Sequence, residues 1–429
     1  MNTSSKYFEL VPGLTICRAL TGLWQIADLE RDGNKVNAEQ AALAMNAYAE
    51  AGFTTFDMAD HYGSAEEISG VFKTNYSKGK AQLFTKWVPK PGPVTKETVR
   101  EAVQLALGRL QSEQIDLMQF HAWSYAHPSW LDCLFYLQEL KEEGLIKHVG
   151  LTNFDTAHLQ IVVNSGIDVV SNQVCYSLLD QRAAGKMSEL CLKHNVKLLA
   201  FGTVAGGFLS EKWLNKPEPL LNDSLTWSQM KYKRFIDAAG GWDKFQSLLK
   251  TLDSIAKKYN VSIANMASKY ILENPAVAGV IIGARLGKSE HIQDNEKLFS
   301  FHFDEDSKKQ IAQSLAGLTT IPGDCGDEYR KPPFLTASGD LSHHVESFPA
   351  PYPSFAGSDG RTKALSGTIW EDLAGFSRAV KKGNRILVSG TTATHGSKSI
   401  GGNDPAAQMH YIIDKIEGAC LLYTSDAAD

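Results

Sequence analysis

Short apolar runs alternate with longer amphipathic segments over the first two thirds of the chain. Segments such as 38–52, 96–111 and 130–144 carry apolar residues at three- and four-residue spacing, and polar residues fill the remaining positions. This spacing is typical of helices that bury one face. The apolar runs between them predict eight strands, at Ala19–Trp24, Thr54–Met58, Leu83–Trp87, Ile115–Phe120, His148–Asn153, Asp168–Val174, Lys197–Gly202 and Gly279–Gly283.

Strands that are apolar on both faces and alternate with helices indicate a parallel sheet covered by helices. Eight such units favour a closed α/β fold, the (β/α)8 TIM barrel, within residues 1–319. The rival is an open doubly wound sheet, whose usual GxGxxG motif would follow the first strand. Residues 22–28 instead read GLWQIAD, which favours the barrel. Pro12-Gly13 between apolar flanks predicts an N-terminal hairpin over Tyr7–Cys17.

The composition of the sequence changes after the barrel. Residues 320–356 are rich in Pro, Gly and Ser, which predicts a linker. Residues 357–420 then predict a partial α+β segment, with two strands joined around Lys382-Gly383-Asn384 and a helix capped by Asp404. Because so few residues bury little surface, this segment is expected to be incomplete or dependent on partners. Residues 421–429 are interpreted as an artefactual tail.

Composition narrows the classes of partner. The 429 residues include 43 Lys and Arg against 48 Asp and Glu, a net charge of −5 that offers no general attraction to nucleic acid or to an anionic membrane. A small-molecule partner is expected. The scattered cysteines have no CxxC pair, which favours reduced thiols and a cytoplasmic location. No metal site is expected, because His343-His344 has no acidic or thiol ligand at a suitable spacing.

Four ionisable side chains fall at or just after consecutive expected strands, where barrel active sites form. These are Asp57, Tyr62, Lys86 and His121. Reduction of a carbonyl builds negative charge on its oxygen and needs a proton donor. Tyr62 could donate that proton if Lys86, held by Asp57, lowered the pKa of the phenol. His121 could orient the carbonyl through one hydrogen bond. The long segment Leu209–Asn260 is expected to include a loop over the barrel mouth.

The motifs FDMADHYG, FTKW and QFHAW resemble the catalytic tetrad motifs of the aldo-keto reductase superfamily, and the similarity extends over about residues 7 to 318. The resemblance implies that Asp57, Tyr62, Lys86 and His121 are catalytic. It also implies NADPH as cofactor, rather than NADH, and reduction of an aldehyde or ketone to an alcohol. The cofactor-binding residues implied by the matching stretches are Gly22, Trp24, Thr152, Asn153, Gln173, Tyr176, Gly202, Thr203, Gly206, Gly207, Gly283, Arg285, Glu290 and Asn295. Tyr176 would stack on the nicotinamide, and Arg285 would bind the 2′-phosphate. Trp24, Trp87 and Trp123 could line the substrate pocket.

Residues 357–420 resemble the first half of the YjgF-like reactive-intermediate deaminases, whose trimeric members hydrolyse enamines and imines. The arginine of that family's active site lies in a later strand that has no match here. Two alternatives to a simple reductase remain open. The barrel could be a regulatory subunit that senses the cofactor with little turnover. The chain could also be bifunctional, with a complete C-terminal domain that hydrolyses imines and forms trimers.

Overall fold

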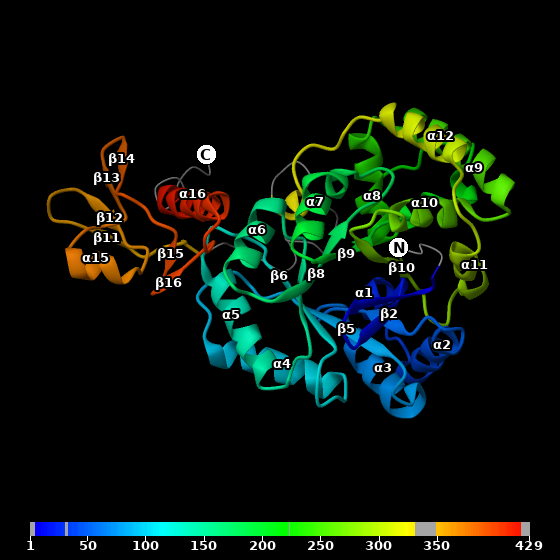
Figure 1. Cartoon of the computed structure of the whole chain (residues 1–429), viewed down its shortest axis with the longest axis horizontal. Coiled ribbons are helices and arrows are strands. Elements are labelled where there is room, and N and C mark those ends of the chain that lie inside the picture. Colours follow the sequence, from blue (N-terminus) through cyan, green and yellow to red (C-terminus); the bar gives the residue numbers. More distant parts are fainter. Residues whose placement is uncertain (1–4, 31–32, 223, 331–348, 422–429) are drawn as a thin grey trace.

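Eight parallel strands close into a barrel in the larger part of the molecule (Figure 1). The computed structural model describes residues 5–30, 33–222, 224–330 and 349–421. Its strands follow the chain around the barrel, and β10 pairs with β3 to close it. They are β3 (Ala19–Gly22), β4 (Thr55–Asp57), β5 (Gln82–Trp87), β6 (Leu117–His121), β7 (Val149–Thr152), β8 (Val169–Cys175), β9 (Lys197–Phe201) and β10 (Val277–Gly283). The barrel prediction and all eight predicted strands are confirmed.

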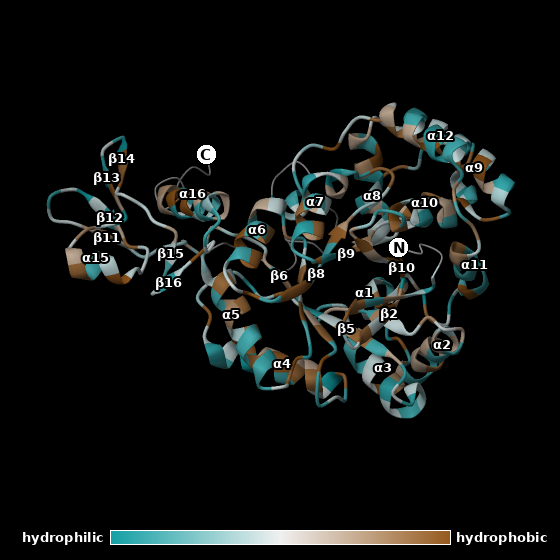
Figure 2. Cartoon of the chain, in the orientation of Figure 1, coloured by the Kyte–Doolittle hydropathy of each residue, from teal (hydrophilic) through white to brown (hydrophobic). Residues whose placement is uncertain are grey.

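Helices cover the outside of the barrel and turn polar faces to solvent (Figure 2). Several begin at a side chain that accepts a hydrogen bond from the backbone two or three residues on, such as Thr95, Asp155 and Ser262. The helices of the barrel region are α1 (Trp24–Leu29), α2 (Ala38–Glu50), α3 (Ala65–Phe72), α4 (Lys96–Arg109), α5 (Ser129–Glu142), α6 (Thr156–Asn164), α7 (Lys186–Lys193), α8 (Trp227–Ala238), α9 (Trp242–Tyr259), α10 (Ile263–Leu272), α11 (Ile292–Glu296) and α12 (Glu305–Ala316).

The predicted N-terminal hairpin is present. Strand β1 (Tyr7–Val11) pairs antiparallel with β2 (Leu14–Cys17), and Gly13 adopts the left-handed conformation, with φ 81°, that the turn requires. Apolar side chains of the hairpin, including Leu10 and Ile16, pack in one cluster with side chains from the barrel strands. The hairpin thus closes one end of the barrel and leaves the carboxyl ends of the strands for the site.

The long connection between β9 and β10 differs from its prediction. Helix α8 lies at the barrel mouth where a loop was expected, and Trp227 and Ser228 in its first turn face the cavity described below. The helix starts here because Thr226 and Gln229 form a reciprocal capping box, with each side chain bound to the other residue's backbone N–H. The cover of the site is therefore a capped helix that holds its side chains in fixed positions.

The predicted linker begins too early. A short helix, α13 (Asp327–Arg330), packs on the barrel instead. Arg182 binds Asp180 at 2.6 Å and Glu328 at 2.8 Å, and these side chains are almost completely buried. Charge pairing and hydrogen bonding thus anchor a segment whose composition predicts none of this order. Residues 331–348 lie outside the described residues. Strand β11 (Ser354–Ala356) shows that the C-terminal unit also starts before residue 357.

The C-terminal unit has a four-stranded antiparallel sheet in the order of the chain (Figure 1). Strands β13 and β14 turn at Gly383, and Asp404 caps the final helix through the backbone N–H groups of Ala406 and Ala407. The remaining elements of the unit are β12 (Thr362–Ala364), α15 (Ile369–Ala374), β13 (Ala379–Lys382), β14 (Arg385–Val388), β15 (Thr394–His395), β16 (Lys398–Ser399) and α16 (Pro405–Leu421).

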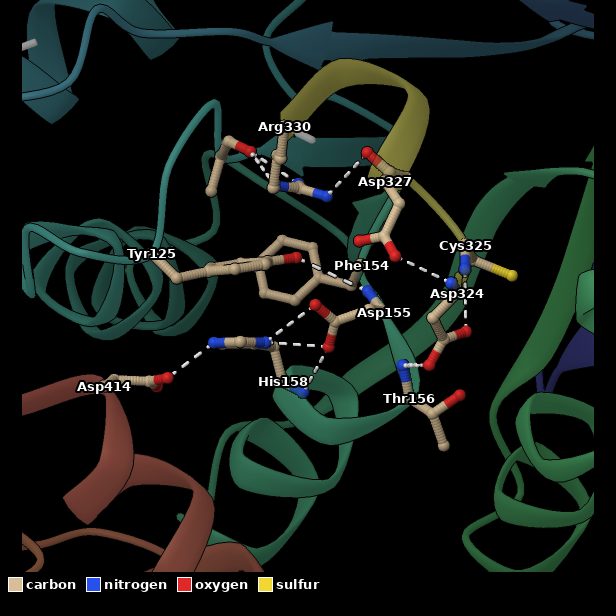
Figure 3. Close-up of polar contacts among 12 residues, drawn as sticks. Tyr125, Phe154, Asp155, Thr156, His158, Asp324, Cys325, Asp327, Arg330 and Asp414 are labelled. Carbon is tan, nitrogen blue, oxygen red and sulfur yellow. Dashed lines mark hydrogen bonds and ion pairs between the residues drawn. The ribbon is translucent and has the colours of Figure 1, made fainter. Parts of the chain in front are cut away.

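Helix α16 packs along α6 of the barrel and carries polar contacts to it. His158 of α6 lies between the carboxylates of Asp155 and Asp414, at 2.7 and 3.1 Å (Figure 3). Nearby, His395 contacts Asp132 at 2.7 Å. The C-terminal unit is thus docked through specific polar contacts with the barrel.

Candidate active site

A cavity opens at the carboxyl ends of the barrel strands. Parallel pairing brings these ends level, since Gly22 pairs with both Asp57 and Gly283, and His121 pairs with Thr152. The cavity is lined by Gly22, Trp24, Gln25, Asp57, His61, Tyr62, Lys86, Val88, His121, Trp123, Thr152, Asn153, Gln173, Phe201, Gly202, Val204, Gly206, Trp227, Ser228, Lys231, Tyr232, Ile281, Gly283 and Tyr329. All four predicted catalytic side chains are among them.

Asp57 and Lys86 form a buried ion pair. Lys86 Nζ donates to Asp57 Oδ2 at 2.6 Å and to the Met58 carbonyl at 2.8 Å. The other oxygen of Asp57 accepts from the side-chain amides of Gln119, at 2.9 Å, and Gln173, at 2.7 Å. Burial lowers the pKa of Lys86, although the Asp57 carboxylate opposes this shift. The carboxylate therefore acts as an anchor for the ammonium.

Tyr62 lies beside this pair, in the loop between β4 and α3. The centroid of its ring is 4.9 Å from Lys86 Nζ. Trp24 packs edge-on against the ring, with centroids 4.9 Å apart, and His61 does so at the same distance. An ammonium carries three N–H groups, and two of those on Lys86 are used by Asp57 and Met58. The third can stabilise a phenolate on Tyr62.

His121 lies across the cavity mouth from this loop. Its Nδ1 is 3.2 Å from the Thr152 carbonyl oxygen and 3.4 Å from Asn153 Nδ2. A neutral imidazole serves one of these contacts at a time, because the carbonyl needs Nδ1–H and the amide needs the Nδ1 lone pair. With the amide as partner, Nε2 carries the proton and becomes a donor. Asn153 itself has a left-handed backbone, with φ 58°, at the end of β7.

The structure brings together only part of the predicted cofactor set. Two predicted glycines have no room for a side chain, since a Cβ on Gly202 would lie 2.3 Å from the Tyr232 hydroxyl and one on Gly22 would lie 2.7 Å from Ile281. Eight of the predicted residues line the cavity, namely Gly22, Trp24, Thr152, Asn153, Gln173, Gly202, Gly206 and Gly283. The lining does not include Tyr176, Thr203, Gly207, Arg285, Glu290 or Asn295.

Two aromatic predictions need correction. Tyr176 is buried away from the cavity, and its hydroxyl accepts a hydrogen bond from Asn274 at 3.2 Å. Phe201, at the end of β9, lines the cavity in its place. Trp87 faces a separate hollow under the β5–α4 loop, whereas Trp24 and Trp123 do line the main cavity. Residue type alone cannot tell which face of a strand end points inward, and this caused both errors.

Four more predicted cofactor residues lie outside the cavity lining. Thr203 is buried with its hydroxyl 3.0 Å from that of Ser268, so it supports the loop after β9. Arg285 and Glu290 are exposed on the segment that follows β10, and Asn295 is largely buried in α11. These last three positions suit a long ligand that leaves the cavity along β10, and their roles remain predictions.

Among the cavity residues that sequence reasoning missed are residues of α8 and α13. Trp227, Lys231 and Tyr232 belong to α8, whose apolar positions at helical spacing were a usable signal. Tyr329 comes from α13, inside the predicted linker, and its ring centroid lies 5.6 Å from that of His121. No local pattern marks Tyr329, because its position depends on the buried contact between Arg182 and Glu328.

Comparison with known proteins explains this geometry. A model of the Aldo/keto reductase family matches residues 20–316. The chain belongs to this family. It is therefore an oxidoreductase, and members of the family act on carbonyl compounds with nicotinamide cofactors. The matched residues end before the C-terminal unit, so its resemblance to YjgF-like proteins stays a prediction.

Relatives of this aldo/keto reductase are identical to it at roughly a quarter of the positions in the matched regions. The uncharacterized oxidoreductase YqkF of Bacillus subtilis (strain 168) is 29% identical over 259 residues, covering 57% of this chain and 78% of that protein. Flagellar radial spoke protein 5 of Chlamydomonas reinhardtii is 26% identical over 257 residues, covering 50% of this chain and 49% of that protein. The chain thus spans about half the length of this second relative.

Solved structures share the barrel. The glycerol dehydrogenase AKR11B4 from Gluconobacter oxydans has a TM-score of 0.64 at 21% identity, over 76% of this chain and 98% of that one. An aldo/keto reductase from Klebsiella pneumoniae, solved with NADP and acetate, has a TM-score of 0.53 at 18% identity, over 72% of this chain and 95% of that one. At these identities the likeness shows the fold alone.

The cavity suits a nicotinamide. Thr152 Oγ1 and Asn153 Oδ1 are buried there, and neither has a hydrogen-bond partner among the described residues. Gln173 uses its amide nitrogen for Asp57 and Gln119, which leaves its oxygen as an acceptor. Three polar oxygens can thus meet a carboxamide, and Phe201 offers a flat apolar face. Among the described residues, no helix is long and apolar enough to cross a membrane, and no acidic, histidine or cysteine cluster could hold a metal ion.

Proposed function

We propose that this aldo/keto reductase reduces an aldehyde or ketone to an alcohol, with NADPH as the hydride source and Tyr62 as the proton donor. The observation that carries the proposal is the convergence of Tyr62, the buried Asp57–Lys86 pair and His121 on one cavity. When bound, the cofactor would supply a hydride to the carbonyl carbon. The protein must then stabilise and protonate the carbonyl oxygen.

Each side chain has a distinct task in this scheme. Tyr62 gives its phenolic proton to the carbonyl oxygen, and the Lys86 ammonium, 4.9 Å from the ring centroid, stabilises the resulting phenolate. Asp57 is a positioning residue that holds Lys86. His121 orients the carbonyl through Nε2–H, which requires the Asn153 amide to donate to Nδ1. Asn153 Oδ1 then remains for the carboxamide.

On the cofactor side of the cavity, Phe201 would stack on the nicotinamide ring, the role first expected of Tyr176. Thr152, Asn153 and Gln173 would bind the carboxamide, and Gly202 and Gly206 would let the backbone approach the pyrophosphate. The exposed Arg285 would bind the 2′-phosphate, and this contact would favour NADPH over NADH. A comparison of NADPH and NADH binding by wild type and Arg285→Ala tests this part separately.

Tyr62→Phe tests the proton donor. The variant keeps the ring packed against Trp24 and removes one hydroxyl. We expect NADPH binding, followed by tryptophan fluorescence, to stay within a few-fold of wild type. Carbonyl reduction should fall by about 100-fold or more, in line with the loss of a general acid. Undiminished turnover in Tyr62→Phe would refute the assignment.

Rapid mixing separates a reductase from a cofactor sensor. The wild-type protein is loaded with NADPH and mixed with a panel of aldehydes, and NADPH absorbance is followed over a single turnover. A reductase oxidises its cofactor on the time scale of steady-state turnover. Oxidation that stays very slow across the panel would favour the sensor.

A further inference from the structure

A buried glutamine, Gln119, lies inside the barrel next to the active-site cavity. It is the first residue of the QFHAW motif and stands on β6, where Lys86 of β5 is its partner in the register. Its side chain is completely buried, and the described residues that line the cavity do not include it. Gln119 can therefore affect a ligand in the cavity only through neighbours that do line it.

The polar atoms of Gln119 belong to a closed ring of three hydrogen bonds. Its Nε2 donates to Asp57 Oδ1 at 2.9 Å, and Gln173 Nε2 donates to the same oxygen at 2.7 Å. Gln173 Nε2 also donates to Gln119 Oε1 at 2.8 Å, which closes the ring. All three side chains are buried, so these hydrogen bonds are shielded from competition with water.

This ring fixes the orientation of the Gln173 amide. The Asp57 carboxylate is paired with Lys86 and only accepts hydrogen bonds, so both amides must turn their NH2 groups toward it. The second N–H of Gln173 then meets Gln119 Oε1, and the Gln173 oxygen is the group left to face a ligand. One hydrogen bond alone would let the amide turn about that bond. The contact with Gln119 holds its plane.

The orientation of Gln173 matters for the amide end of a nicotinamide. The NH2 group of a carboxamide has two N–H donors. In the proposed complex, Asn153 Oδ1 accepts one of them and Gln173 Oε1 accepts the other, since both residues line the cavity. Recognition of this NH2 group thus depends on a Gln173 oxygen that points into the cavity.

We infer that Gln119 is a positioning residue that holds Gln173 as an acceptor for the carboxamide NH2 of the cofactor. This inference rests on the proposed cofactor site and deepens it, because it assigns the recognition of one chemical group to a residue outside the cavity. Gln119 itself touches neither cofactor nor substrate. Its effect is therefore specific for the NH2 group, and the remainder of the dinucleotide is bound without it.

A matched pair of dinucleotides tests the inference without turnover. NADP+ and its 3-acetylpyridine analogue share the ring carbonyl, but the analogue has a methyl group in place of the NH2. Both dissociation constants are measured by isothermal titration calorimetry for wild type and three variants. Gln119→Met removes the hydrogen bonds at similar length, and Gln119→Glu is the conservative replacement. Met118→Leu, at a buried apolar position on the same strand, is the control.

We expect wild type to bind NADP+ about tenfold more tightly than the analogue, a difference of roughly 1.4 kcal/mol. Gln119→Met should reduce this preference to about threefold, because one of two hydrogen bonds to the NH2 group is weakened. Met118→Leu should keep the wild-type preference. Gln119→Glu should also keep it at about pH 6, because burial beside Asp57 keeps the new carboxyl protonated. A protonated carboxyl can donate to Asp57 and accept from Gln173, as the amide does.

The outcomes separate this inference from the proposed function. If wild type prefers NADP+ and Gln119→Met keeps the full preference, the cofactor site stands and the role of Gln119 is refuted. An equal loss of affinity for both dinucleotides in Gln119→Met would also refute that role and assign Gln119 to packing of the barrel. So would a preference in Gln119→Glu at pH 6 that is as low as in Gln119→Met. Failure of wild type to bind either dinucleotide would refute the nicotinamide site itself, and this inference with it.

Discussion

The contact between His158 and Asp414 offers a test of how the C-terminal unit is held on the barrel. Burial alone would lower the pKa of His158, but the carboxylates of Asp155 and Asp414 raise it to about 9 (Figure 3). The ring also stacks on Tyr125, with centroids 3.4 Å apart. His158 is therefore charged at neutral pH, although its side chain is almost completely buried.

The size of the effect follows from the pKa shift. The pKa of His158 rises from 6.5 to about 9, and one unit corresponds to about 1.4 kcal/mol, so the charged ring contributes roughly 3 kcal/mol. Because the folded-state pKa is raised, this stability is fully present below pH 6.5 and is lost as the pH rises through 9. Asp155 makes two contacts, at 2.7 and 2.9 Å, and Asp414 makes one at 3.1 Å. We assign about a third of the effect, roughly 1 kcal/mol, to Asp414.

Asp414→Asn is the perturbation, and urea unfolding of the full chain between pH 6 and pH 10 is the assay. We expect the variant to be less stable by about 1 kcal/mol below pH 6.5, with the difference vanishing above pH 9, where the ring is neutral in both proteins. An NMR titration should show a lower pKa for His158 in the variant. Glu417→Gln, on an exposed position of the same helix, is the control. A difference that is the same at every pH would refute the reasoning.

Three further predictions concern the barrel. Lys86→Met should destabilise the fold by about 3–5 kcal/mol, because it leaves the Asp57 carboxylate buried and unpaired. Adding Asp57→Asn should restore much of this stability in thermal unfolding but no carbonyl reduction. Gly202→Ala should lower stability and NADPH affinity more than Gly207→Ala, since both have positive φ but only the Gly202 site would drive a Cβ into Tyr232. Arg330→Met should weaken NADPH binding several-fold, measured by titration, because Arg330 holds the Asn153 carbonyl at 2.7 Å; equal binding by both proteins would show that this contact is dispensable.

The local pattern of apolar and polar residues was enough to predict most of the barrel. Strands such as Lys197–Phe201 and Val277–Gly283 are buried on both faces. Burial on both faces requires a nearly continuous apolar run, and such a run can be recognised in the sequence. The segment 324–330 has no such apolar run. Its order comes from long-range contacts, because Arg182 pairs with Glu328 and the Thr156 backbone N–H donates to Asp324 at 2.9 Å. A Pro- and Gly-rich composition reports weak local preference, and tertiary contacts override it here.

The candidate site divides in the same way. The four proposed catalytic side chains could be located because each lies at the end of a strand that the apolar pattern predicts, or in the loop after it. Phe201 and Tyr176 could not be told apart, since both are aromatic residues near strand ends and the direction of each ring is set by packing. Lys231 could not be found either, because its place in the site depends on how α8 lies over the mouth.

A continuous set of contacts runs from the C-terminal unit to the proposed cofactor site. Asp414 contacts the His158 ring, which stacks on Tyr125. The Arg330 guanidinium lies on the opposite side of the Tyr125 ring, 4.3 Å from its centroid (Figure 3). Arg330 in turn binds the carbonyl of Asn153. When α16 is docked, it thus holds the side chains of Tyr125 and Arg330 in place. These side chains in turn hold the backbone of Asn153, which is in the strained left-handed region. Docking of the C-terminal unit and the geometry at the proposed cofactor site should therefore depend on each other. We expect the Asp414→Asn protein to bind NADPH more weakly than wild type below pH 6.5, and this difference in affinity should shrink above pH 9, where His158 is neutral in both proteins.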